Sequence, residues 1–317
     1  MSILVSGSLA YDRIMDFPGK FSDHILPDKI HVLNVCFMID GLKENFGGTA
    51  GNIAYALSLL GERPTIIATA GRDFEPYRGW LATNKISSGH IKIINEELTA
   101  GAYITTDKSD NQITAFNPGA MKFSSSFDFD SVEHEEAIAI IAPGNLDDMS
   151  NFSKIYKQKK IDYIFDPGQS IPAWSGERLC EMIEGAKVFI CNDYELQLVQ
   201  DKTSMTIDDI LGKAETLITT KGESGSTVTL KENNEIRNID IPVVKAYPVN
   251  DPTGAGDAYR AGLIKGLMLP QKDIVHAAKI GSACASYSVE VYGSQNFYFT
   301  HESFNKKFED TFGEVAF

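Results

Sequence analysis

The sequence predicts an α/β fold in which helices cover both faces of a mainly parallel sheet. The first observation is that short apolar runs alternate with segments of helical periodicity, which is typical of βαβ units. The second is that two stretches, at about residues 13–46 and 98–120, break this alternation and fit a small separate β-structure. The third is that 317 residues with 43% hydrophobic composition contain no linker or repeat, so we expect one main domain over residues 1–317.

The elements of the main sheet can be placed in order along the chain. Short, mostly apolar runs suit strands that are buried on both faces of a parallel sheet. These runs are Ile3–Val5, Thr65–Ala68, Ala137–Ile141, Tyr163–Phe165, Val188–Ile190 and Thr216–Thr219. Helical periodicity predicts the helices Gly51–Leu60, Met149–Lys159, Glu177–Gly185, Tyr194–Val199 and Asp257–Leu267.

The second β-structure is expected to be a lid. Ala100–Thr106 and Gln112–Phe116 predict a hairpin around the turn-forming residues Lys108–Asn111. Ligands of open α/β sheets bind outside the carboxyl ends of the strands. A small sheet projecting there would cover such a site.

The charge of the chain excludes some classes of partner. There are 29 Lys and Arg residues against 43 Asp and Glu, which gives a net charge of −14. An acidic surface disfavours nucleic acids and anionic membranes. No apolar run reaches the ~18 residues of a membrane span, and no basic segment precedes an apolar one at the start. We therefore expect a cytoplasmic protein.

The cysteines predict no metal or redox centre. Cys36, Cys180, Cys191 and Cys284 lie far apart, and no C-x-x-C pair is present. We expect buried free thiols.

The strongest motif lies between Asn250 and Gly262. Gly254, Ala255 and Gly256 immediately precede the helix that begins near Asp257, so their N–H groups are expected to form an anion hole at a helix N-terminus. Asp257 could then accept the proton of a hydroxyl group that attacks a phosphorus atom held there. The alternative is that Asp257 is an ordinary acid in the first turn of a helix.

Two segments resemble the signatures of a known family. Asp251–Asp257 is similar to the C-terminal signature of the ribokinase-like (pfkB) carbohydrate and nucleoside kinases, and Gly47–Asn52 resembles their N-terminal signature. The resemblance implies a three-layer αβα sandwich with a β-lid. It also implies that Asp257 is the catalytic base and that Gly47, Gly48 and Asn52 bind a sugar. Without the resemblance, Gly47–Asn52 could equally be a glycine turn that caps a helix.

Seven further positions, in four segments of the chain, match the family, and each segment has a structural alternative. Asp12 matches the family position that binds two vicinal ribose hydroxyls, and its structural alternative is to cap a turn. Ser282 matches a position that contacts adenine, and its alternative is to allow tight packing of a helix against the sheet. Asn192 and Glu195 resemble an Asn-x-x-Glu motif that holds Mg²⁺ through water, or they form a capping box. Thr220, Gly222 and Gly225 match the family's loop that contacts the ATP phosphates. This segment could also be a plain turn.

A narrower resemblance, to the mycobacterial type of bacterial adenosine kinases, extends from Ile3 to about Gln295. It implies ATP-dependent phosphorylation of the adenosine 5′-hydroxyl and a homodimer formed through the lid. The substrate residues implied in addition to Asp12, Gly48 and Asn52 are Ser8 for the ribose, Phe116, Tyr103 and Gln169 for the base, and Cys36, which reaches the partner's site.

Several points stay open. Ala102, Asn117 and Trp174 depart from the adenosine kinase pattern, so other nucleosides are possible substrates. A sugar kinase and a non-catalytic nucleoside- or sugar-binding protein remain alternatives. Activation by K⁺ through Asp251–Thr253 and the Gly293 loop is common in the family and is left undecided.

Overall fold

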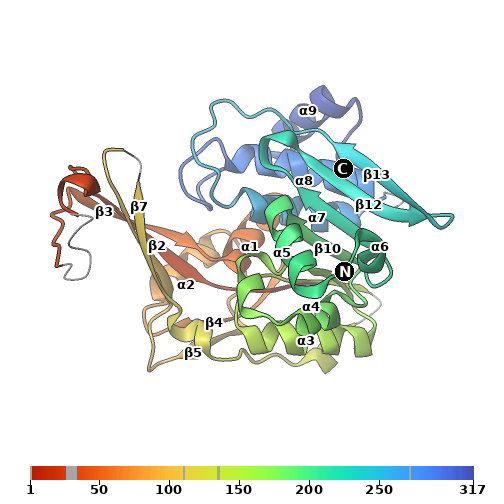
Figure 1. Cartoon of the computed structure of the whole chain (residues 1–317), viewed down its shortest axis with the longest axis horizontal. Coiled ribbons are helices and arrows are strands. Elements are labelled where there is room, and N and C mark those ends of the chain that lie inside the picture. Colours follow the sequence, from red (N-terminus) through yellow and green to blue (C-terminus); the bar gives the residue numbers. More distant parts are fainter. Residues whose placement is uncertain (1, 26–33, 110, 134–135, 271–272) are drawn as a thin grey trace.

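The computed structural model describes residues 2–25, 34–109, 111–133, 136–270 and 273–317, and it contains two sheets (Figure 1). The large sheet has nine strands in the order β13-β12-β11-β10-β9-β8-β1-β4-β5. Its strands are β1 (Ser2–Ser6), β4 (Thr65–Gly71), β5 (Ile91–Ile94), β8 (Ala137–Ile141), β9 (Asp162–Phe165), β10 (Val188–Asn192), β11 (Thr216–Thr220), β12 (Ser226–Glu232) and β13 (Glu235–Ile241).

The strands from β5 to β11 are parallel, and β12 and β13 extend the edge as an antiparallel hairpin. The mainly parallel sheet is thus confirmed. The hairpin is absent from the sequence-based prediction. Its turn is made by Asn233 and Asn234, both with positive φ, a conformation that asparagine tolerates in tight hairpins.

Helices cover both faces of the large sheet, as predicted. One core cluster packs α1 (Thr49–Leu59), α2 (Glu75–Thr83), α7 (Ala255–Leu267), α8 (Ile274–Ser288) and α9 (His301–Phe312) against one face. A second cluster packs α3 (Leu146–Lys159), α4 (Gly176–Ile183), α5 (Asp193–Thr203) and α6 (Ile207–Leu211) against the other. The helices α7 and α8 approach closely, since a Cβ at Gly266 would lie 2.3 Å from the Ala277 Cα.

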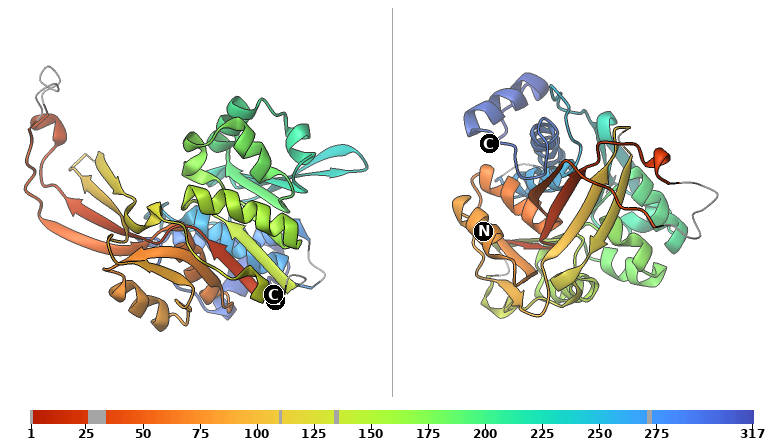
Figure 2. Two further views of the ribbon diagram at one scale, coloured as in Figure 1. Left: turned by 90° about the horizontal axis from the view of Figure 1, so that it is seen from below. Right: turned by 90° about the vertical axis from the view of Figure 1, so that its left-hand side faces the viewer.

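The small sheet, called the lid below, has the order β3-β2-β6-β7 and projects from one end of the body (Figure 2). It consists of β2 (Ala10–Asp16), β3 (Gly41–Gly47), β6 (Ala100–Thr106) and β7 (Gln112–Asn117). The predicted hairpin is therefore present as β6 and β7. Asp110 of its predicted turn and residues 26–33 of the predicted lid segment lie outside the described residues.

The structure corrects the prediction of buried thiols. Cys191 and Cys284 are buried, but Cys36 is exposed and Cys180 is half-buried. All four are free. Among the helices of the described ranges, none combines the length and apolar character that crossing a membrane requires.

Candidate active site

The glycine turn before α7 is constrained by its neighbours. Gly254 has a φ of +81°, and a Cβ there would lie 2.6 Å from the Ser294 Cβ, so only glycine fits. Asp251 braces the turn, because its carboxylate accepts the N–H of Thr253 at 2.9 Å and that of Gly293 at 3.0 Å. Partial burial opposes ionisation of Asp251, but these hydrogen bonds hold its pKa below the usual range.

The predicted anion hole needs one correction. The N–H of Ala255 donates to the Pro252 carbonyl at 3.2 Å, so it is engaged within the turn rather than pointing into open space. Gly254 and Gly256, at the N-terminus of α7, remain the candidate donors to an anion.

Asp257 lies in the first turn of α7, where one of its carboxylate oxygens is hydrogen-bonded across the site. The Nδ2 of Asn52, in α1, donates to Asp257 Oδ2 at 2.8 Å. Burial raises the pKa of Asp257 to about 7, against the opposing influences of the Asn52 hydrogen bond and of Arg260. The two family signatures therefore meet at this carboxyl group, which has the properties of a general base that works near neutral pH.

An ion pair that the sequence analysis assigned no role lies beneath Asp257. Arg260 Nε and Nη2 bond to the Asp166 carboxylate at 2.7 and 3.1 Å, and the two side chains are only 7% and 4% exposed. Arg260 Nη1 also donates to the Gly256 carbonyl at 3.1 Å. The pair thus ties the end of β9 to the start of α7. The one available signal was an arginine within an otherwise small and apolar helix segment.

At the base of the lid, Asp12 lies against Gly47, which together with Gly48 is called the glycine pair below. A Cβ at Gly47 would lie 2.4 Å from Asp12 Oδ2, and Gly48, with a φ of +87°, lies directly against the Ser8 carbonyl. Burial, followed by repulsion from Asp251, raises the pKa of Asp12 to about 6. The Ser8 hydroxyl accepts the Thr49 N–H at 3.0 Å, so it caps α1 in this structure.

The register of the lid decides which predicted residues share a face. Asp12, Ala102 and Phe116 lie opposite one another on adjacent strands and therefore face the same way. Phe116 is 52% exposed on this face. Tyr103 lies on the other face, where its hydroxyl accepts Arg13 Nη1 at 3.0 Å. The structure therefore places Tyr103 on the opposite face of the lid from Phe116.

A large cavity of about 710 Å³ opens beside the glycine turn. This volume suits a nucleotide-sized ligand. Its lining brings together Thr220, Gly222, Gly225, Gly256 and Ser282, which were predicted to bind ATP, and Ala255 of the predicted anion hole. However, the Ser282 hydroxyl donates to the Pro242 carbonyl at 2.9 Å and accepts the Val244 N–H at 3.1 Å. It therefore organises the wall of the cavity, which agrees with the packing role given as the alternative, and it still has one lone pair to offer a ligand.

Asn192 and Glu195 form a capping box at the start of α5. Asn192 Oδ1 accepts the Glu195 N–H at 2.7 Å, and Glu195 Oε2 accepts the Asn192 N–H at 2.8 Å. The structural alternative is therefore present. Within the described ranges, no cluster of three or more His, Cys, Asp or Glu residues could hold a metal directly.

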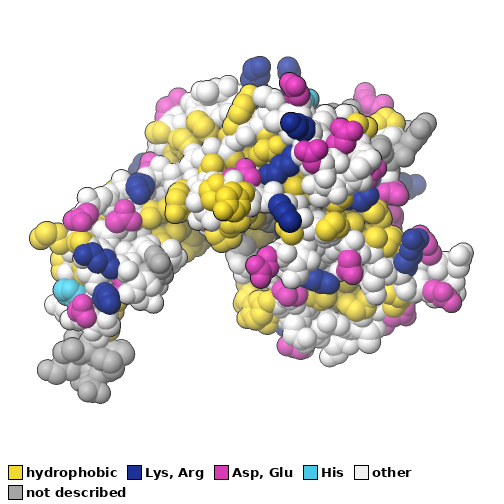
Figure 3. Space-filling model, turned by 90° about the horizontal axis from the view of Figure 1, so that it is seen from above, with side chains coloured by type: hydrophobic (Ala, Val, Ile, Leu, Met, Phe, Trp, Pro, Cys, Tyr) yellow, Lys and Arg dark blue, Asp and Glu magenta, His cyan; other side chains and the backbone are white. Residues whose placement is uncertain are grey.

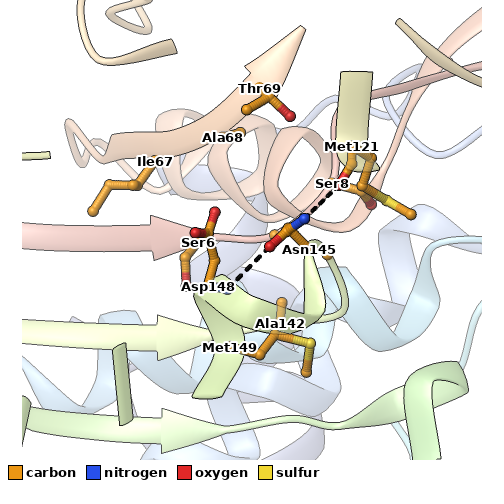
Figure 4. A pocket seen from close by; sticks show the side chains of 12 residues that line it. Ser6, Ser8, Ile67, Ala68, Thr69, Met121, Ala142, Asn145, Asp148 and Met149 are labelled. Carbon is orange, nitrogen blue, oxygen red and sulfur yellow. Dashed lines mark hydrogen bonds between the residues drawn. The ribbon is translucent and has the colours of Figure 1, made fainter. Parts of the chain in front are cut away.

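Two further features lie at the carboxyl ends of the strands. Gln169 is exposed after β9, in the 3-10 turn Gly168–Ala173. Behind Ser8 is a cavity of about 10 Å³, in which the Asn145 amide donates to the Met121 carbonyl and accepts the Asp148 N–H (Figure 4). That space holds about one water molecule, so it is not the substrate site.

Comparisons with known proteins agree with this geometry. The model of the pfkB family of carbohydrate kinases matches residues 33–300. The nucleoside kinase of Methanocaldococcus jannaschii is 34% identical over 265 residues, which cover 83% of this chain and 85% of that protein. The structure of the Burkholderia thailandensis nucleoside kinase in complex with inosine has a TM-score of 0.85 at 35% identity, with 99% of each chain covered.

A more distant structure, Arabidopsis thaliana ribokinase complexed with ribose and ATP, shares the fold with a TM-score of 0.78 at 18% identity. The ribokinase-like fold with a lid is thereby confirmed. The two relatives with 34% and 35% identity are nucleoside kinases, whereas the sequence analysis found a resemblance to the mycobacterial type of adenosine kinase. The chain belongs to the pfkB family of carbohydrate kinases.

Proposed function

We propose that this protein transfers the γ-phosphoryl group of ATP to the 5′-hydroxyl of a purine nucleoside, with adenosine and inosine as the first candidates. One observation carries the proposal: Asp257 lies between the two halves of such a site. The large cavity, which would hold ATP, is lined by Ala255 and Gly256, immediately before Asp257. On its other side, Asn52 joins Asp257 to the Gly47–Asn52 segment, against which Asp12 lies. Between the lid and the body the surface is hollowed (Figure 3).

The chemistry follows from the donors around Asp257. Asn52 bonds to Oδ2, and none of the described residues is seen to donate to Oδ1, which would accept the proton of the attacking hydroxyl. The N–H groups of Gly254 and Gly256 and the dipole of α7 would stabilise the charge on the transferred phosphoryl group. Asp12 would hold ribose hydroxyls through its ionised carboxylate.

The residues present also suit the metal ions of such a reaction. Mg²⁺ keeps most of its water and needs few protein ligands. The capping box uses Oε2 of Glu195, so Oε1 of Glu195 and the amide of Asn192 would hold magnesium-bound water. Mg²⁺ would neutralise charge on the ATP phosphates. K⁺ activation in the family involves two segments, Asp251–Thr253 and the Gly293 loop. The hydrogen bond from the Gly293 N–H to the Asp251 carboxylate brings these two segments together.

The base would be recognised by Phe116 and Gln169. Phe116 offers an exposed ring on the Asp12 face of the lid. The amide of Gln169 can donate or accept at either end after rotation, so it can pair with the edge of adenosine or of inosine. This would give a nucleoside kinase with a broad purine range, which the inosine complex of the Burkholderia thailandensis relative supports.

The direct test is release of ADP from Mg²⁺-ATP with adenosine, inosine, guanosine, cytidine, ribose and fructose, each with and without K⁺. We expect turnover with purine nucleosides. Turnover with ribose or fructose alone would instead establish a sugar kinase, the second candidate, since Asp12, Gly47 and Asn52 require only a sugar. No turnover with any acceptor would contradict the proposal and favour a binding protein.

Truncation of Phe116 separates nucleoside from sugar recognition. Stacking of a base on an aromatic ring is worth about 1–3 kcal/mol, so Phe116→Ala should lower kcat/KM for adenosine by about 5- to 150-fold. Use of ribose, if present, should hardly change. Phe123→Ala, which removes an exposed phenylalanine beyond the lid, should leave both values unchanged. Equal losses for adenosine and ribose in Phe116→Ala would show that its ring only packs the hairpin.

We also propose a homodimer formed through the lid. Met15, Leu42 and Ile113 align on the lid face opposite Asp12, and Leu42 and Ile113 are exposed there. A second copy would cover this apolar row. Sedimentation velocity should show a dimer that Leu42→Glu converts to a monomer. Ile236→Glu, at an exposed apolar position of β13, should leave the dimer intact. A monomeric wild-type protein would contradict the proposal.

A further inference from the structure

A series of buried side-chain hydrogen bonds, called the amide relay below, runs from Trp80 through Gln295 and Asn52 to Asp257. Gln295 is 2% exposed and lies in the loop between α8 and α9. Its Oε1 accepts the Trp80 indole N–H at 2.9 Å, and its Nε2 donates to Asn52 Oδ1 at 2.9 Å. Asn52 Nδ2 then donates to Asp257 Oδ2 at 2.8 Å. Neither Gln295 nor Trp80 has a role in the proposed site so far.

The orientation of Gln295 is set by partners whose hydrogen-bonding roles are fixed. An amide can exchange its oxygen and nitrogen by rotation, so its neighbours determine which atom points where. The indole N–H of Trp80 can only donate, which directs Oε1 of Gln295 towards α2. Nε2 of Gln295 then donates to Tyr77 Oη at 2.7 Å as well as to Asn52. Tyr77 gives its own hydrogen to the Gly47 carbonyl, so its oxygen accepts.

The orientation of Gln295 in turn determines that of Asn52. Asn52 Oδ1 accepts from Gln295 Nε2 and from Ser294 Oγ, each at 2.9 Å. If the Asn52 amide rotated, its NH₂ group would face the Gln295 NH₂ group and its oxygen would face the Asp257 carboxylate. Both contacts would be repulsive, and buried groups would lose their partners. The relay therefore keeps a donor directed at Asp257.

We propose that Gln295 is a positioning residue of the phosphoryl-transfer site, which holds the Asn52 amide so that Asp257 always receives a hydrogen bond. The indole N–H of Trp80 acts through Gln295 in the same sense. This inference rests on the proposed function, in which Asp257 is the general base. It adds two residues, from α2 and the loop after α8, that touch neither substrate nor the reacting atoms.

The ionisation of Asp257 should depend on this donor. Burial raises the pKa of Asp257, and the Asn52 hydrogen bond is the largest influence that lowers it. The charged groups facing Asp257 are Arg260, which also lowers the pKa, and Asp166 and Asp12, which raise it; the Tyr77 phenol interacts with it as well. A base must be ionised to act, so kcat/KM of the wild type should fall below about pH 7. Weakening the donor should move this fall to higher pH.

The experiment compares pH profiles of kcat/KM for a nucleoside in the wild type, Gln295→Leu and Trp80→Phe. In Gln295→Leu the acid limb should rise by about one pH unit, which means an about tenfold lower kcat/KM at pH 6 and a smaller change at pH 9. Trp80→Phe keeps a ring stacked on Phe46 and Tyr55 but removes the indole donor, so it should move the limb in the same direction by less.

Tyr55→Phe is the matched control. It removes another buried hydrogen bond in the same aromatic layer, from Tyr55 Oη to the Phe297 carbonyl, outside the relay. Its acid limb should equal that of the wild type. A loss that is equal at every pH in Gln295→Leu and Trp80→Phe, with an unmoved limb, would overturn the inference and show only a structural role.

Failure of this inference can be told from failure of the proposed function. If the wild type phosphorylates no nucleoside or sugar, both fail. If the wild type is active and the variants keep its acid limb, only the positioning role fails. Should Gln295→Leu not fold, as judged by its thermal unfolding, the limb of Trp80→Phe decides the question.

Discussion

Turnover should fall by about 10²–10⁴-fold when Asp257 is replaced by Asn, because general base catalysis contributes about that factor. Asn keeps the shape of the side chain and can still accept the Asn52 hydrogen bond, but it cannot take up the proton of the attacking hydroxyl. Nucleoside binding, measured by calorimetry, should persist, since Asp12 and the glycine pair are untouched. The measurement is therefore kcat of Asp257→Asn with Mg²⁺-ATP and adenosine beside its Kd for adenosine.

Asp147→Asn is the control for this variant. Asp147 is an exposed acid in the first turn of α3, which is the ordinary role that Asp257 would have if it took no part in chemistry. Its replacement should leave kcat unchanged. Near wild-type turnover in Asp257→Asn would show that Asp257 is also only a first-turn acid and would exclude its assignment as base.

The features that the sequence predicted well are local ones. Apolar runs and helical periodicity place the strands β1, β8 and β11 and the helix α3 to within a few residues, because each pattern depends on neighbours along the chain. The turn before α7 is predictable for the same reason, since Gly254 is the residue that a left-handed turn requires.

The errors arise where the outcome depends on pairing between distant segments. Tyr103 and Ala102 are adjacent, and only the register with β2 decides which of them shares a face with Asp12. The Ser282 hydroxyl donates to the Pro242 carbonyl, 40 positions earlier in the chain, which the sequence analysis did not anticipate. Sequence patterns contain no information on such partners.

The same reason explains what the sequence analysis missed. Gln295 and Trp80 are 215 positions apart in the chain, and Arg260 and Asp166 are 94 apart. Neither pair belongs to a spacing pattern that a helix, strand or turn imposes. A buried charge or amide therefore becomes informative only when its partner in space is known.

Breaking the Arg260–Asp166 pair should give the largest loss of stability. Arg260→Met leaves the Asp166 carboxylate buried without its counter-ion, which should lower the free energy of unfolding by about 3–5 kcal/mol. Urea denaturation of Arg260→Met, with Arg178→Met as the control, measures this effect. Arg178 pairs with Glu181 on the exposed surface of α4, so its replacement should cost less than about 1 kcal/mol.

The double variant Arg260→Met/Asp166→Leu separates stability from chemistry. Removing both charges restores an uncharged, filled core, so most of the lost free energy of unfolding should return. Activity at neutral pH should not return, because Arg260 lowers the pKa of Asp257 more strongly than Asp166 raises it. Without both, less of the base is ionised, and the acid limb of kcat/KM should lie at higher pH than in the wild type. Recovery of stability and of the wild-type pH profile together would show that the ion pair only joins β9 to α7 and has no influence on the base.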